Sequence, residues 1–202
     1  MLPKTEIVWR HLLHEADRDV RRHPSISALA DDLGMGISTV HKALRLPADM
    51  GAVIVKPAGG IRVLDPFRLA VLWAGRRRLD RDVIDTWRTD LGAPDVERRI
   101  ALPGVVLGGH GAVVARLARN TIADYASVIA FTDRPGHLRS VIPEMPDGPT
   151  TVVVAQPDPA LHRYGNVTPL HQAWVDLFTR PDWQAARFVE AIASRWVTTD
   201  AA

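Results

Sequence analysis

The sequence contains no cysteine among its 202 residues. Disulfide frameworks, thiolate zinc sites and cysteine nucleophiles are therefore excluded, and only histidine and carboxylate side chains remain as metal ligands. The chain also lacks a run of 18 or more apolar residues, so no segment has the character of a membrane-spanning helix. Its first ten residues include Lys4, Glu6 and Arg10 and no apolar signal-peptide region, which predicts a cytoplasmic protein.

Motifs of the common enzyme classes are also missing. The eight histidines show no HExxH pairing, no serine lies in a nucleophile-elbow sequence, and the carboxylates form no pair typical of two-metal chemistry. The glycine cluster Gly108–Gly111 lacks a third glycine at position 114, which Val114 occupies, and no Gly-Lys-Ser/Thr follows. We therefore predict a structural turn at this cluster, and a chain that is not an enzyme and has no cofactor and no metal site.

The charge of the chain is small overall but uneven. The formal net charge is +2, yet residues 1–88 hold 15 Lys and Arg against 11 Asp and Glu, whereas residues 89–202 hold 10 against 12. Contacts to phosphate require Lys and Arg on one surface. The asymmetry fits a nucleic-acid-binding half joined to a sensing or partner-binding half, and it equally fits an ordinary solvated surface.

The first half of the chain has the spacing of a helix-turn-helix. Apolar residues at helical spacing predict a first helix from Lys4 to about Val20. A second helix is predicted over 28–33, with Ser27 as its N-cap and Ile26 as a hydrophobic staple. Gly34-Met35-Gly36 then supplies a tight turn, and a third helix is predicted from Ile37 to about Leu46.

A hairpin is predicted directly after the third helix. The β-branched runs 53–56 and 61–64 flank the four-residue loop Pro57-Ala58-Gly59-Gly60. On the third helix, Val40, Ala43 and Leu44 share one face, and polar side chains point away from it. The order helix, helix, turn, helix, hairpin predicts a winged helix-turn-helix domain that binds double-stranded DNA.

The residues expected to contact DNA follow from that arrangement. We predict that Ser38, Thr39, His41 and Lys42 read the major groove and that Arg45 supports them. Lys56 and Arg62 are expected to contact phosphates beside the groove. Additional candidates are Ser27, Arg76, Arg77 and Arg78, although three arginines at a helix end also complement the helix dipole.

The segments "SISALADDLGMGISTVHKAL" and "MGAVIVKPAGGIRVLD" resemble bacterial winged-helix regulators. The resemblance covers about a third of the chain and implies the winged-helix fold more specifically than it implies an operator. The DNA partner expected is an operator, including the chain's own promoter.

The second half predicts a mixed domain. Asp65-Pro66 begins a helix into the three arginines, and helical spacing continues to a break at 92–94. Strands are predicted at 105–107, 127–131 and 150–155, a helix at 112–119, and two closing helices after Thr168-Pro169 and at Asp182. The predicted fold class is α+β, with a winged helix at 1–75, a connecting helix at 76–95 and an α/β regulatory or partner-binding domain at 96–202.

The segments "VVLGGHGAVVARLA" and "VTPLHQAWVDLFTRPDWQAARFVEAI" are similar to antitoxin regulators of AbiE type. This resemblance implies a repressor of its own operon that is paired functionally with a nucleotidyltransferase-type toxin, without catalysis by this chain. Two other interpretations stay open: a winged helix that binds a partner protein, and a metabolite-sensing repressor with a ligand site near Gly108–Gly111. The sequence does not decide between monomer and dimer or between repressor and activator.

Overall fold

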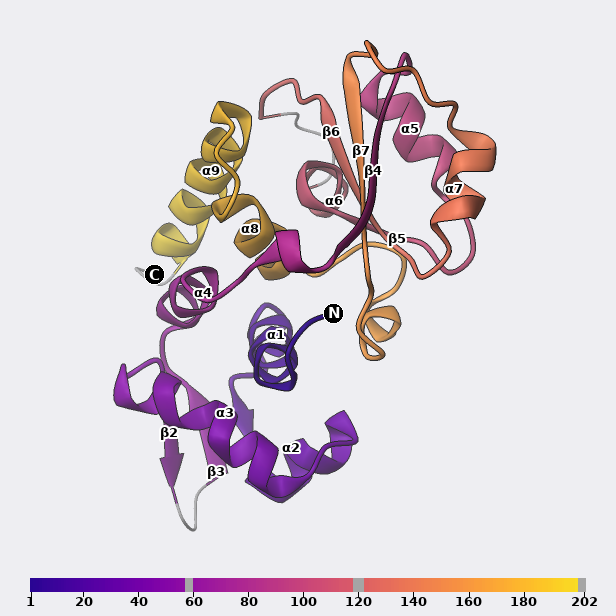
Figure 1. The fold of residues 1–202 in the computed structure, drawn as a ribbon. Coiled ribbons are helices and arrows are strands. Elements are labelled where there is room, and N and C mark those ends of the chain that lie inside the picture. The colour runs from indigo at the N-terminus through magenta and orange to yellow at the C-terminus, as the bar shows by residue number, and fades with distance from the viewer. Residues whose placement is uncertain (57–59, 118–121, 200–202) are drawn as a thin grey trace. The chain divides into compact units, whose positions relative to one another are not determined.

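The computed structural model describes residues 1–56, 60–117 and 122–199, and the chain divides into two compact units, residues 2–76 and residues 77–202 (Figure 1). Both units combine helices with a β-sheet, which confirms the predicted α+β class. Each unit has its own sheet and its own buried side chains. They are described separately below.

The amino-terminal unit combines helices with a small sheet. In chain order its elements are α1 (Lys4–Ala16), β1 (Arg22–His23), α2 (Ile26–Leu33), α3 (Ile37–Asp49), β2 (Val53–Lys56), β3 (Gly60–Val63) and α4 (Pro66–Ala74). The first helix is shorter than predicted, since it ends at Ala16 and not near Val20. Asp19 then takes a left-handed conformation with φ of 62°. Strand β1, which follows it, has no counterpart among the sequence predictions.

The segment from α2 to α3 is defined by its caps. Ser25 is extended, and its Oγ accepts a hydrogen bond from the Ala28 N–H at 3.0 Å, so Ser25 is the N-cap of α2. The prediction of Ser27 as N-cap is wrong, because Ser27 already lies within the helix and its Oγ is 2.8 Å from that of Ser25. Gly34 ends α2 with φ of 61°, in the left-handed conformation expected of a glycine at a helix end.

A tryptophan of α1 holds helix α3 from behind, and a second tryptophan, in α4, bonds to α1. The Trp9 indole N–H of α1 donates a hydrogen bond to the Ala43 carbonyl of α3 at 2.7 Å. The Trp73 indole N–H of α4 donates to Glu6 Oε2 of α1 at 2.8 Å, and both rings are fully buried. Satisfied indole donors allow these large rings to pack in a core. One face of α3 is therefore fixed against α1, and the helix continues beyond its predicted end to Asp49.

The sheet of this unit has the strand order β1-β3-β2, with both pairings antiparallel. The predicted hairpin strands are confirmed at β2 and β3, while the predicted loop residues 57–59 lie outside the described residues. Gly60 has φ of 72°, and a Cβ there would lie 2.2 Å from the His23 carbonyl oxygen. Glycine is therefore required where β3 passes β1.

The carboxy-terminal unit is built around a four-stranded sheet. Its elements are η1 (Leu79–Arg81), β4 (Val83–Thr89), α5 (Ala93–Arg99), β5 (Val106–Gly108), α6 (Gly109–Arg116), β6 (Ser127–Phe131), α7 (Pro135–Val141), β7 (Thr150–Ala155), η2 (Leu161–Tyr164), α8 (Leu170–Phe178) and α9 (Trp183–Thr199). The strand order is β4-β7-β6-β5. The central pair β6 and β7 is parallel, and the two outer pairs are antiparallel.

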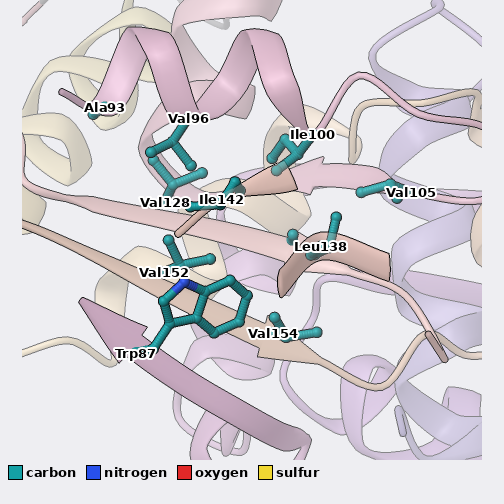
Figure 2. Close-up of a cluster of buried hydrophobic side chains, with 11 residues drawn as sticks. Trp87, Ala93, Val96, Ile100, Val105, Val128, Leu138, Ile142, Val152 and Val154 are labelled. Carbon is teal, nitrogen blue, oxygen red and sulfur yellow. The ribbon is translucent and has the colours of Figure 1, made fainter. Parts of the chain in front are cut away.

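Apolar side chains cover both faces of this sheet. Figure 2 shows Trp87, Val128 and Val152 directed toward the residues of α5 and α7. A second cluster, on Ile129, Phe131 and neighbouring positions, fills the opposite face. Burial on both faces explains why β6 and β7 are continuous apolar runs, and both were predicted with their observed bounds.

The connecting helix predicted at 76–95 is wrong. Helix α4 begins as predicted, with Asp65 Oδ1 accepting from the Arg68 N–H at 2.8 Å, but it ends at Ala74. The residues beyond it form η1 and strand β4. Trp87 and Thr89 are buried while Thr86 and Arg88 are exposed, which is the alternation of a strand.

Other differences in this unit concern helix boundaries. Helix α6 begins at Gly109, before the predicted start at Ala112, and the predicted end at Arg119 lies outside the described residues. Helices α8 and α9 begin where the sequence predicted them. Asp182 caps the last one, accepting the Ala185 N–H at 2.8 Å.

Candidate nucleic-acid interface

Helix α3 presents a polar stripe on the side opposite its buried face. Val40, Ala43 and Leu44 are buried, with at most 2% of each residue exposed. Four polar residues at the spacing i, i+3, i+4, i+7 are exposed, and these are Ser38, His41, Lys42 and Arg45. This spacing places them on one face of the helix. Thr39, the fifth residue predicted on this helix, is half-buried at its edge.

An exposed apolar side chain, that of Ile37, lies beside the polar stripe. Ile37 was not among the predicted DNA contacts. It is the first residue of α3, and 56% of it is exposed. It lies one turn before His41, but also three and seven residues before Val40 and Leu44, so helical spacing places it at the boundary between the polar stripe and the buried face. Its exposure at the first position of α3 was therefore not predictable from that spacing.

The surroundings of this stripe carry positive charge. Helix α3 contains Lys42 and Arg45, and its one carboxylate, Asp49, is its last residue. The three strands of the adjoining sheet contain Arg22, Lys56 and Arg62 and no carboxylate. A surface of this composition attracts polyanions, and the attraction weakens with ionic strength.

The outer face of the sheet brings together residues that are distant in the sequence. Arg62 of β3 is exposed and lies directly opposite Ile54 of β2 and Arg22 of β1. Lys56 is exposed on the same strand face as Ile54, two residues closer to the end of the hairpin. Lys56 and Arg62 were predicted as DNA contacts, whereas Arg22 was not, because the pairing of β1 with β3 was not predicted.

The remaining residues predicted to contact DNA differ in their exposure. Ser27, in the first turn of α2, and Arg76 and Arg78, after α4, are exposed. Arg77 is 1% exposed, and its guanidinium is 2.6 Å from both Asp82 Oδ2 and Asp176 Oδ1. Burial opposes its charge, but Asp176 and Asp82 outweigh burial and raise the pKa of Arg77 above its ordinary value. The prediction of Arg77 as a DNA contact is wrong, because its charge is already neutralised inside the carboxy-terminal unit.

The glycine cluster at the start of α6 serves close packing. A Cβ on Gly108 would lie 2.6 Å from the Phe131 ring, and a Cβ on Gly109 would lie 2.7 Å from Ile129 Cδ1. Gly109 also has φ of 56°. These glycines therefore allow α6 to approach β6, but the prediction of a turn at Gly108–Gly111 is wrong, because Gly109–Gly111 form the first turn of α6.

Within the ranges that the structure covers, no three His, Asp or Glu side chains come close enough together to hold a metal ion. Across the same ranges, no helix has both the length and the hydrophobicity needed to cross a membrane.

Comparison with known proteins gave no relative of this chain. No family model matches it, and neither does any curated protein or solved structure.

Proposed function

We propose that the chain is a winged helix-turn-helix transcriptional regulator that binds double-stranded DNA sequence-specifically through α3 and the β1-β3-β2 sheet. The observation that carries this proposal is the exposed stripe of Ser38, His41, Lys42 and Arg45 on a helix whose other face is held by Trp9. A rigid helix with donors on its outward face suits insertion into the major groove, which is about 12 Å wide.

Each outward side chain has a contact that its chemistry favours. Lys42 can donate to guanine O6 and N7, and Ser38 and His41 can bond to base edges beside it. Arg45, one turn later, is placed to contact the phosphate backbone. Lys56 and Arg62 would bind phosphates from the sheet, and such contacts position the duplex without reading its sequence.

The biological setting proposed for this activity is autoregulation. The resemblance of the second half to antitoxin regulators of AbiE type supports a repressor that acts on its own promoter and is paired with a nucleotidyltransferase-type toxin. The carboxy-terminal unit would then supply the regulatory or partner-binding part. The charge of Arg77 is paired with Asp82 and Asp176 inside that unit, so the proposal does not use Arg77 as a DNA contact.

The experiment is a binding titration of the full chain on a duplex from its own upstream region and on a scrambled duplex, each at two salt concentrations. We expect promoter-selective binding, a steep loss of affinity at higher salt, and a penalty of about 1–3 kcal/mol on the promoter for Lys42→Ala. Arg98→Ala, which removes an exposed arginine of the other unit, serves as the control and should bind like the wild type. Absence of binding to both duplexes at low salt would contradict the proposal.

A further inference from the structure

The strand β1 places one arginine directly against another. In the antiparallel pairing of β1 with β3, Arg22 is the partner of Arg62. The Val63 N–H donates to the Arg21 carbonyl at 2.8 Å, so the neighbouring pair Arg22 and Arg62 occupies a non-hydrogen-bonded position of the ladder. Side chains at such positions are close, with Cβ atoms about 4.5–5.5 Å apart. Two guanidinium groups therefore project side by side from one sheet face.

This arrangement is unfavourable in the absence of an anion. Like charges directly opposite each other destabilise a sheet, whereas opposite charges stabilise it. Among the described residues, neither Arg22 nor Arg62 forms an ion pair with a carboxylate. Both side chains are exposed. An external anion bound here would reduce the repulsion between the two guanidinium groups. It would also accept charge-assisted hydrogen bonds from both.

A surface hollow lies at the same place. Its volume is about 550 Å³, and its lining consists of Asp19, Val20, Arg21, Arg22 and Arg62. Three arginines against one aspartate give the hollow a net positive charge, and the planar guanidinium group suits the bidentate binding of phosphate oxygens. Asp19 holds a left-handed backbone conformation, which turns the chain from α1 into β1 and brings Arg21 to the rim.

We propose that Arg22 and Arg62, with Arg21 at the rim, form a site for a backbone phosphate of the same DNA duplex that α3 reads. This inference rests on the proposed function and extends the contact surface from the hairpin across β3 to β1. Lys56 lies opposite Gly60, two residues along β3 from Arg62, so the three cations form one row on the outer face. The row binds DNA without sequence preference and sets the position of the duplex against α3.

The test compares the full-length chain with Arg22→Thr, Arg62→Thr and the double variant, and Arg98→Thr is the control with the same change of charge. Threonine keeps the strand propensity, so the sheet is expected to stay folded. Plotted as log affinity against log salt concentration, the double variant should reduce the steepness of the slope by about 0.9, the value for one phosphate contact, and each single variant should reduce it by no more than that. Arg98→Thr should keep the wild-type slope and affinity.

A second measurement examines the site without DNA. At matched ionic strength, replacing chloride with inorganic phosphate should raise the melting temperature of the wild type by about 1–3 °C more than that of the double variant. In chloride alone, Arg22→Thr should melt no lower than the wild type, because it removes the repulsion.

The outcomes separate the site from the proposed function. If Lys42→Ala weakens DNA binding but the Arg22 and Arg62 variants bind with the wild-type slope, the phosphate site and the phosphate contact proposed for Arg62 are wrong, while sequence reading by α3 stands. If the wild type binds no DNA while phosphate still stabilises it through these arginines, the hollow takes a free anion and both the DNA site and the proposed function are overturned. If phosphate has no differential effect and DNA does not bind, the arginine pair binds no phosphate of either source.

Discussion

Ile37, the first residue of α3, is large and apolar, and 56% of it is exposed to solvent. Its neighbours on that face are Ser38 and His41, which are polar and also exposed. An apolar group among major-groove donors has one natural contact there, the 5-methyl group of thymine. If α3 reads DNA as proposed, we expect Ile37 to make base preference depend on this methyl group as well as on hydrogen bonds.

We expect Ile37→Ala to weaken binding to a selected duplex by about tenfold and to leave the salt dependence unchanged, because no phosphate contact is lost. Replacing each thymine of the duplex in turn by uracil removes only the methyl group. One such replacement should weaken the wild type and have no further effect on Ile37→Ala. Equal losses for both proteins at every position would show that Ile37 contacts no thymine.

His110 is the clearest titratable group in the core of the carboxy-terminal unit. Its ring stacks on Tyr125 with centroids 5.0 Å apart and meets Phe188 edge-on at 4.9 Å. It is 1% exposed, and neither ring nitrogen has a hydrogen-bond partner in the described structure. Burial therefore lowers the pKa of His110 from 6.5 to about 4, although Asp182, 3.8 Å away, opposes this shift.

The stability of the fold should depend on pH through this residue. Between about pH 6.5 and pH 4 the unfolded chain binds a proton that the folded chain does not, so stability is lost as the pH falls through this window. His110→Leu should reduce the loss of unfolding free energy between pH 7 and pH 4 by about 3 kcal/mol. Chemical denaturation at several pH values measures this unfolding free energy. His137→Leu, at an exposed position, is the control. Identical pH profiles for His110→Leu and the wild type would contradict this assignment.

For single residues, the sequence correctly predicted exposure where it depends only on spacing within one helix. The four polar residues of the α3 stripe were selected because helical spacing alone separates them from Val40 and Leu44. Arg22 and Arg77 were misjudged because their environment depends on partners distant in the chain. Arg22 meets Arg62, and Arg77 meets Asp176 across 99 positions of sequence. No local pattern reports such pairings.

The orientation of α3 depends on the turn that connects it to α2. Gly34 has φ of 61° and no heavy atom within 4 Å of a Cβ built on it. Gly36, the N-cap of α3, has an ordinary φ of −66°, and atoms near its Cβ position are 3.9 Å away. The two glycines thus differ in backbone conformation and hardly differ in steric surroundings.

Gly34→Ala should lower the free energy of unfolding by about 1–2 kcal/mol, because a side chain rarely adopts this conformation. Gly36→Ala is the matched control, and we expect it to be neutral or slightly stabilising, since it reduces the entropy of the unfolded chain. Denaturant titration of both variants gives the comparison. If Gly36→Ala costs as much as Gly34→Ala, the conformation of Gly34 is not the reason for its presence.

Among the elements, strands β6 and β7, which consist mainly of apolar residues, were predicted with their observed bounds. The segment of β4, which mixes polar and apolar residues, was wrongly predicted as a helix. β6 and β7 are apolar on both faces, so their bounds were visible in the sequence. Ile84 and Trp87 of β4, together with Leu91 beyond its end, fit a helical spacing, and this led to the prediction of a helix. Pairing with β7 decides in favour of a strand, and its register is shifted between Val83 and Asp85 by an irregularity. That competition is settled by tertiary contacts and not by local propensity.

For the whole molecule, the division into two compact units has a direct consequence. Every side chain in the proposed α3 and sheet surfaces lies within residues 2–76, which have their own core around Trp9 and Trp73. We expect the isolated fragment 1–76 to unfold in one cooperative transition and to keep the salt dependence of the full chain to within about one phosphate contact. A folded fragment without DNA affinity would mean that residues 77–202 supply essential contacts.

The division of labour between the units follows their charge and burial. The amino-terminal unit exposes its cations on α3 and the sheet, whereas the carboxy-terminal unit contains Arg77 in a fully buried network. The α+β class and most elements of the first unit were predictable from local patterns, while β1 and the topology of the second sheet depend on long-range pairing.

The most direct test of sequence-specific DNA binding is selection from a random duplex library by the full-length chain, followed by sequencing of the bound fraction. We expect the wild type to enrich one motif, and a Ser38, His41 and Lys42 triple alanine variant to bind duplexes without enriching it, since its sheet contacts remain. Enrichment of the same motif by the triple variant, or no enrichment by the wild type, would contradict the assignment of α3 as the reading helix.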